Sequence, residues 1–137
     1  MKPIFLGDWA EENTQQQPWN SDETGPLAHL KSDFEIDDQT LEGVEIMLAF
    51  YTYEDYSGDA FVLFRNDSQL YEVNGSHCSC YGLEGQWEPE ETTIDVLEHR
   101  LNEGSLGVDD YWYGEGAKNK FAVELRTVLA QLKEAIN

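Results

Sequence analysis

One stretch of the sequence restricts the possible folds more than any other, because residues 43–53 are apolar at both odd and even positions. Successive side chains of a β-strand point to opposite faces of the sheet. Each face of this strand would therefore carry apolar or aromatic side chains: Val44, Ile46, Leu48 and Phe50 on one, and Met47, Ala49, Tyr51 and Tyr53 on the other. This pattern is typical of a central strand that is covered on both sides.

Two further strands and two helices complete the expected fold. Strands are predicted at 60–65 and 69–73, and the turn residues between them are so few that an antiparallel meander is expected. A helix is predicted near 92–103, capped by Thr92, and a longer one over 117–136, where the apolar residues form one stripe. We therefore expect an α+β fold. It combines an antiparallel meander of three to four strands with a long C-terminal helix and a shorter helix packed against it.

The 137 residues fit one domain better than two. Within a single domain 1–137 we expect four sections, in chain order: an irregular N-terminal arm (1–40), the antiparallel sheet (43–75), a loop rich in glycine and cysteine (76–91) and a helical part (92–137).

The chain is strongly acidic. It holds 28 acidic and 8 basic residues, a formal net charge of −20, and between Lys2 and Arg65 the only cation is Lys31. Such a chain repels phosphates, so direct nucleic-acid binding is not expected. Duplex DNA carries one charge per ~1.7 Å, so 20 charges match roughly 34 Å of duplex, close to the diameter of about 35 Å expected for a compact chain of this length. The charge therefore points to a basic partner protein. Solubility alone is the competing explanation.

Carboxylates that lie near aromatic residues are the candidate partner-binding groups, because aromatic side chains supply much of the binding energy at protein interfaces. Burial of the same rings in the core is the alternative. Acids of one helix, spaced three or four residues apart, would also form a phosphate-like row. The predicted partner-binding residues are Glu54, Asp55, Asp59, Glu88, Glu90, Glu91, Asp95, Glu98, Asp109, Asp110, Tyr111 and Trp112.

Both cysteines lie in the segment His77-Cys78-Ser79-Cys80. With His99 as a fourth ligand, His77, Cys78 and Cys80 have the donor types that zinc prefers, although the spacing differs from the usual Cys-x-x-Cys. A cysteine nucleophile paired with His99 is a second interpretation, and a purely structural loop is a third. The expectation is that the protein has no resident cofactor, with zinc as the alternative.

The middle of the chain resembles a family of small acidic proteins of phages and prophages. The resemblance covers about residues 53–93. It includes Leu-Tyr-Glu-Val-Asn-Gly-Ser-His-Cys-Ser-Cys-Tyr-Gly-Leu-Glu at 70–84 and Gln-Trp-Glu-Pro-Glu-Glu-Thr-Thr at 86–93. It implies a phage origin and carries over no catalytic residue. In charge and size the chain is also similar to phage DNA-mimic inhibitors of the antirestriction and anti-CRISPR type.

These observations together predict a phage-encoded, non-enzymatic inhibitor that mimics DNA. Its partner would be a basic host protein, either a nucleic-acid-handling protein or a defence complex. A small metal- or thiol-dependent protein built on the His77–Cys80 loop is the alternative. The longest apolar run, Ile46–Phe50, is far shorter than the ~18 residues of a membrane span, and residues 1–6 are too few for a secretory signal. The expected location is the cytoplasm of the host cell.

Overall fold

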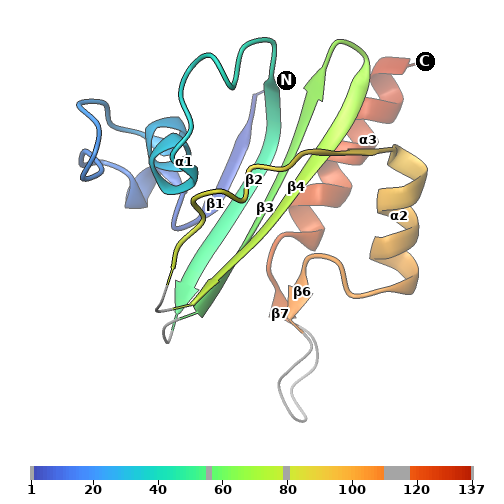
Figure 1. The fold of residues 1–137 in the computed structure, drawn as a ribbon. Helices are drawn as coiled ribbons and strands as arrows, with labels where there is room; N and C mark the ends of the chain where they lie inside the picture. Colours follow the sequence, from blue (N-terminus) through green and yellow to red (C-terminus); the bar gives the residue numbers. More distant parts are fainter. Residues whose placement is uncertain (1, 55–56, 79–80, 110–117, 137) are drawn as a thin grey trace. The chain divides into compact units, whose positions relative to one another are not determined.

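The computed structural model describes residues 2–54, 57–78, 81–109 and 118–136 (Figure 1). The chain divides into two compact units, residues 1–91 and 92–137. The boundary lies within a short strand, and each unit is described below by itself.

The first unit is built on a five-stranded sheet whose strands follow one another in space in the order of the sequence. Its strands are β1 (Ile4–Gly7), β2 (Glu45–Glu54), β3 (Ser57–Asn66), β4 (Gln69–Cys78) and β5 (Glu90–Thr92). The three long strands, β2 to β4, form an antiparallel meander, which confirms the central prediction. β1 pairs with β2 in parallel, with Ile4 opposite Leu48 and Gly7 opposite Tyr51. The sheet is therefore mixed and has five strands: the predicted antiparallel meander forms its centre, and β1 and β5 extend it beyond the three to four strands expected.

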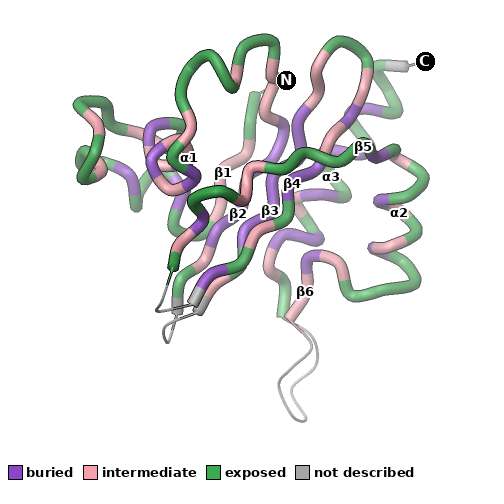
Figure 2. Tube along the Cα trace, in the orientation of Figure 1, coloured by how far each residue is buried: buried purple, intermediate pink, exposed green. Residues whose placement is uncertain are grey.

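Both faces of β2 are buried, as the sequence pattern predicted. Ala49 and Tyr51 lie on one face and Leu48 and Phe50 on the other, and each is at most 9% exposed. The register places Val62 opposite Ala49, so the same two-faced pattern continues into β3. Figure 2 shows buried residues along these strands and exposed residues in the loops.

The segment before β2 contains a helix and a short 3-10 turn. These are α1 (Pro26–Phe34) and η1 (Glu11–Asn13). α1 begins with proline, whose fixed φ suits the first helical position, and it ends where Glu35 adopts a left-handed conformation with φ 55°. Figure 1 shows α1 beside the sheet, and Leu30 and Phe34 of the helix belong to the same core cluster as Ala49 and Val62.

The N-terminal residues are thus an integral part of the first unit. Trp9 is fully buried in its core, between Phe34 and Tyr51. The expectation of an irregular arm over residues 1–40 was wrong for β1 and α1. The predicted loop over 76–91 is also shorter than expected, because β4 continues to Cys78 and β5 begins at Glu90.

The second unit contains two helices and a small two-stranded sheet. Its elements are α2 (Ile94–Glu103), β6 (Val108–Asp109), β7 (Lys118–Asn119) and α3 (Ala122–Ile136). The two helices contact each other, and Arg126 of α3 donates hydrogen bonds to the Asn102 side chain (2.8 Å) and the Leu101 carbonyl (3.1 Å). Both predicted helices are present, so the α+β class is confirmed.

The helix starts differ from the prediction. The N-cap of α2 is Thr93 rather than Thr92, since the Thr93 hydroxyl accepts a hydrogen bond from the Val96 amide at 3.1 Å. α3 begins at Ala122 rather than near residue 117, because Lys118 and Asn119 pair with β6. The carbonyl of Gly107 accepts hydrogen bonds from three successive amides, those of Lys120, Phe121 and Ala122, at 2.8 to 3.0 Å, which anchors the start of α3.

Candidate functional site

The predicted partner-binding acids lie in both units. In the first unit Asp59, Glu88, Glu90 and Glu91 are exposed, and the last two belong to the edge strand β5. Glu54 ends β2, and its side chain lies outside the described part, as do the residues Asp55, Asp110, Tyr111 and Trp112. In the second unit Asp95 is exposed, while Glu98 and Asp109 are intermediate. Of these acids the structure places Asp95 and Glu98 on one face of α2, whereas Glu90 and Glu91, as consecutive residues of a strand, point to opposite faces of the sheet.

The proposed row of carboxylates on the helix is partly neutralised. Asp95 and Glu98 are three residues apart on α2, so they lie on neighbouring positions of one helical face. However, the Glu98 carboxylate forms an ion pair with the Lys133 ammonium of α3 at 2.7 Å. Glu98 therefore contributes to the contact between the two helices, and its charge is largely compensated.

Most of the negative charge has no partner inside the chain. The carboxylates of Glu23, Asp38, Glu45 and Glu98 are among those that form ion pairs with cations of the chain. With 28 acids and 8 cations, at least 28 − 8 = 20 negative charges remain uncompensated whatever the pairing. Exposed carboxylates in this excess are available to an external cation.

The histidine of the His-Cys segment has an aromatic environment. His77 is buried in β4, and its ring stacks on Tyr53 at 4.4 Å with an interplanar angle of 5° and lies 5.5 Å from the ring of Tyr51. His99 is exposed on α2 of the other unit. Among the described residues, no group of three or more His, Cys, Asp or Glu side chains could hold a metal ion. Cys80 and the side chain of Cys78 lie outside that set, so the zinc site remains a prediction.

A carboxylate lies against the buried tryptophan of the first unit. The indole Nε1–H of Trp9 donates a 2.7 Å hydrogen bond to Oδ2 of Asp33 on α1. Burial raises the pKa of Asp33 above its usual value, and the hydrogen bond from Trp9 opposes that shift. Burial, together with the nearby charges of Asp33 and Asp8, also raises the pKa of the Tyr51 phenol well above its usual range. Asp33 is thus a charged group whose ionisation opposes folding.

We expect Asp33→Asn to stabilise the protein at neutral pH. A carboxyl whose pKa is raised from 3.8 in the folded state favours folding when it is protonated. This contribution to stability is fully present at a pH below the pKa of Asp33 in the unfolded chain. It is lost as the pH rises through the higher pKa of Asp33 in the folded protein. Asparagine carries no charge to desolvate and retains an oxygen that can accept the Trp9 bond. The stability gained by the variant should therefore grow between about pH 4 and about pH 7, measured as the thermal unfolding midpoint.

The control for this prediction is Asp22→Asn, which removes the same formal charge from an exposed position of the same unit. Removing any negative charge from this acidic protein reduces the repulsion between its charges. The control measures that general effect, so that the effect of burial at Asp33 can be separated from it. The prediction is contradicted if Asp33→Asn and Asp22→Asn change the unfolding midpoint by the same amount at every pH.

A polar cleft opens beside α1. It has a volume of about 480 Å³ and is lined by residues of the helix and of the loops before and after it: Asn20, Ser21, Ala28, Lys31, Ser32, Glu35, Ile36, Asp37, Asp38 and Thr40. Three of these are carboxylates and one is a lysine. We call this feature the α1 cleft.

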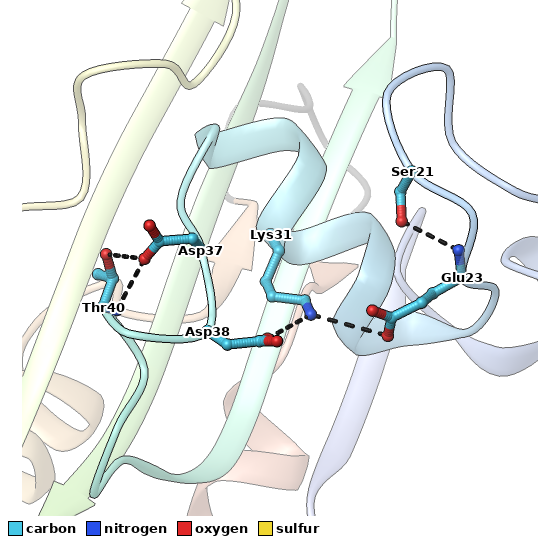
Figure 3. A network of polar contacts seen from close by, with 6 residues as sticks. All are labelled: Ser21, Glu23, Lys31, Asp37, Asp38 and Thr40. Atoms are coloured by element: carbon cyan, nitrogen blue, oxygen red, sulfur yellow. Dashed lines mark hydrogen bonds and ion pairs between the residues drawn. The ribbon is translucent and has the colours of Figure 1, made fainter.

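Lys31 connects the two loops that border the α1 cleft (Figure 3). Its ammonium lies 2.7 Å from Asp38 in the loop after the helix and 3.8 Å from Glu23 in the loop before it. The Lys31 side chain is only 15% exposed. The hydrogen bond to Asp38 raises the pKa of Lys31, which outweighs the opposing effect of burial. Lys31 is therefore already engaged in ion pairs that join the two loops of the cleft.

The other carboxylates of the cleft are not paired with cations. Asp37 accepts hydrogen bonds from the amide and the hydroxyl of Thr40, both at 3.0 Å, and these bonds lower its pKa. Within the part of the chain that the structure describes, neither Asp37 nor Glu35 forms an ion pair. The α1 cleft thus presents ionised carboxylates on a fixed framework.

The α1 cleft was not among the predicted sites. Its acids belong to the general charge excess, and the helix that organises them lies within residues 1–40, which were expected to be irregular. The signal that could have found it is Lys31, the only cation between Lys2 and Arg65, because a lone cation among many acids is expected to gather carboxylates around itself.

Comparison with known proteins finds no matching family model, no matching curated protein and no matching solved structure. The resemblance to small acidic phage proteins therefore stays a prediction. Within the described residues no helix has the length and apolar character that crossing a bilayer requires.

Proposed function

We propose that this protein is a phage-encoded, non-enzymatic inhibitor that places its carboxylates in a basic groove of a host nucleic-acid-handling or defence protein. The observation that carries the proposal is the uncompensated charge: 20 negative charges remain even if every cation of the chain is paired. Solubility alone needs far fewer charges on a domain of this size, for which a net charge of about 2 to 8 is sufficient.

The proposed mechanism is competition for a site that normally takes phosphates. A carboxylate, like a phosphate, accepts charge-assisted hydrogen bonds from arginine and lysine, and arginine binds it in a bidentate geometry. A net charge of −20 also accelerates the approach of a cationic partner, by about 10-fold to 1,000-fold at low salt. DNA and this protein would then exclude each other from the same groove.

The proposal is tested by titrating the protein against a panel of restriction enzymes and CRISPR effector complexes. For a partner that binds, we expect the Kd to weaken by at least about tenfold as NaCl rises from about 50 mM to about 300 mM, because salt screens the charges. Duplex DNA should compete with the protein for that partner. The same titration with a neutral protein of similar size shows how far salt affects the partner itself.

Two results would overturn the proposal. One is an affinity that does not change with salt or is unaffected by competing DNA. The other is a panel with no partner bound at low salt. Stoichiometric zinc in protein purified without a histidine tag, lost on Cys78→Ser or Cys80→Ser, would instead favour the metal- or thiol-dependent alternative.

A further inference from the structure

The two tryptophans of the N-terminal segment lie in opposite environments. Trp9 is fully buried, whereas Trp19 is 86% exposed, more than any other large hydrophobic side chain in the described part of the chain. Tryptophan is strongly enriched among the residues that dominate protein-protein binding energy. An exposed tryptophan in an otherwise acidic region is therefore a candidate interface anchor.

The loop that carries Trp19 is held by hydrogen bonds on both sides of it. Before Trp19, the Gln16 carbonyl lies 2.8 Å from Nε2 of His29, and the Gln17 side chain donates to the Asp22 carbonyl at 2.8 Å. After Trp19, the side chain of Asn20 accepts a hydrogen bond from the Ser32 hydroxyl of α1. The indole is thus presented from a loop that is fixed to α1, which lowers the entropy cost of binding through it.

The α1 cleft begins at the next two residues along the chain, since Asn20 and Ser21 line it. Around it lie four acids and one lysine: Glu23, Glu35, Asp37, Asp38 and Lys31. The formal charge of this group is 1 − 4 = −3. An apolar anchor next to an anionic cleft is complementary to a surface with an apolar slot bordered by arginine or lysine.

We propose that Trp19 and the α1 cleft together form the surface that docks onto the basic partner. The indole of Trp19 enters an apolar slot of that partner, and the unpaired carboxylates of Glu35 and Asp37 accept hydrogen bonds from its arginine or lysine side chains. This inference rests on the proposed function and specifies which of the acidic surfaces carries it. Neither Trp19 nor any residue of the α1 cleft was among the predicted partner-binding residues.

The test uses a probe that does not depend on finding the natural partner. The isotope-labelled full-length protein is titrated by NMR with a short amphipathic peptide of arginine and leucine. The chain has four tryptophans, and the indole signal of Trp19 is assigned by its loss in Trp19→Phe. We expect the Trp19 indole and the amides around the α1 cleft to shift together. We also expect Trp19→Ala to weaken the peptide Kd by about tenfold or more.

Two matched controls accompany the test. Tyr81→Ala removes another aromatic side chain that is 55% exposed, and it should leave the Kd unchanged. The double variant Glu35→Gln/Asp37→Asn and its control Glu88→Gln/Glu90→Gln both reduce the net charge from −20 to −18, and only the first should weaken binding beyond the general effect of charge. Unfolding midpoints close to wild type verify that each variant is folded.

The proposal is overturned if Trp19→Ala binds the peptide as tightly as wild type does, or if the shifts gather at Glu88–Glu91 instead. It is also overturned if the Trp19 signal responds only to protein concentration, which would indicate self-association. The restriction and CRISPR panel tests the proposed function separately. If a panel partner binds with an affinity that depends on salt but is unchanged by Trp19→Ala, the proposed function stands and the proposed docking surface is wrong.

Discussion

Trp9→Ala is expected to destabilise the first unit by about 3–5 kcal/mol, the usual cost of truncating a fully buried tryptophan. The side chain is 0% exposed, and its ring centroid lies 5.8 Å from that of Phe34 and 5.0 Å from that of Tyr51. The substitution also removes the indole N–H that donates a 2.7 Å hydrogen bond to Asp33, so the partly buried carboxylate of Asp33 loses that bond. Because small proteins are stable by only about 5–15 kcal/mol, this is a large share of the total. The measurement is urea unfolding followed by circular dichroism.

The matched control is Trp19→Ala, the same substitution ten residues further along the same unit at a position that is 86% exposed. It should change the stability by no more than about 0.5 kcal/mol. Trp9→Phe keeps an aromatic ring but loses the indole donor, so its effect should lie between the two. Equal unfolding midpoints for Trp9→Ala and Trp19→Ala would refute the assignment of Trp9 to the core.

The central strands could be predicted from the sequence because their pattern is local. Residues 43–53 are apolar on both faces, and short turns connect them to the next two strands, so an antiparallel meander follows directly. The pairing of β1 could not be predicted in the same way. It is only four residues long, and it pairs in parallel with a strand more than 40 residues further on, so neither its length nor its spacing distinguishes it from a loop.

The candidate site was less predictable than the fold. Exposed acids have no periodicity that fixes their neighbours, so the sequence indicated a charged protein without indicating where the charges gather. The α1 cleft depends on α1, a helix of nine residues whose sequence signal was a single proline at its start. The burial of Trp9 and the exposure of Trp19 were also indistinguishable in sequence, because each has one polar and one non-polar neighbour: Asp8 and Ala10 beside Trp9, and Pro18 and Asn20 beside Trp19.

The buried core and the proposed interface of the first unit are connected through α1. Asp33 of the helix binds the indole of Trp9 on the core side, while Lys31, two residues earlier, holds Asp38 and Glu23 at the α1 cleft. Substitutions that displace the N-terminal segment are therefore expected to act on stability first and on partner binding as a consequence. Stability must be measured for every binding variant of this region.

Gly7→Ala is expected to be strongly destabilising because glycine meets two separate requirements at the end of β1. Its φ of +70° is in the left-handed region, which costs other residues about 1–2 kcal/mol. A Cβ there would lie 2.1 Å from the carbonyl oxygen of Tyr51, an atom of the central strand that cannot easily move. That oxygen also accepts the Asp8 amide at 2.7 Å, so relief of the clash would break this bond and displace the neighbouring Trp9.

Gly85→Ala isolates the first of these requirements. Its φ of +79° is close to that of Gly7, but a Cβ at residue 85 would meet nothing within 4 Å, so the expected cost is only about 1–2 kcal/mol. Gly7→Ala should cost at least about 2 kcal/mol more, since overpacking against fixed backbone typically adds 1–3 kcal/mol. Urea unfolding of both variants, together with hydrogen exchange of the β1 amides, measures the difference. If the two variants lose the same stability, the close approach of Gly7 to β2 does not contribute to folding, and the parallel pairing of β1 would then have to be reassigned.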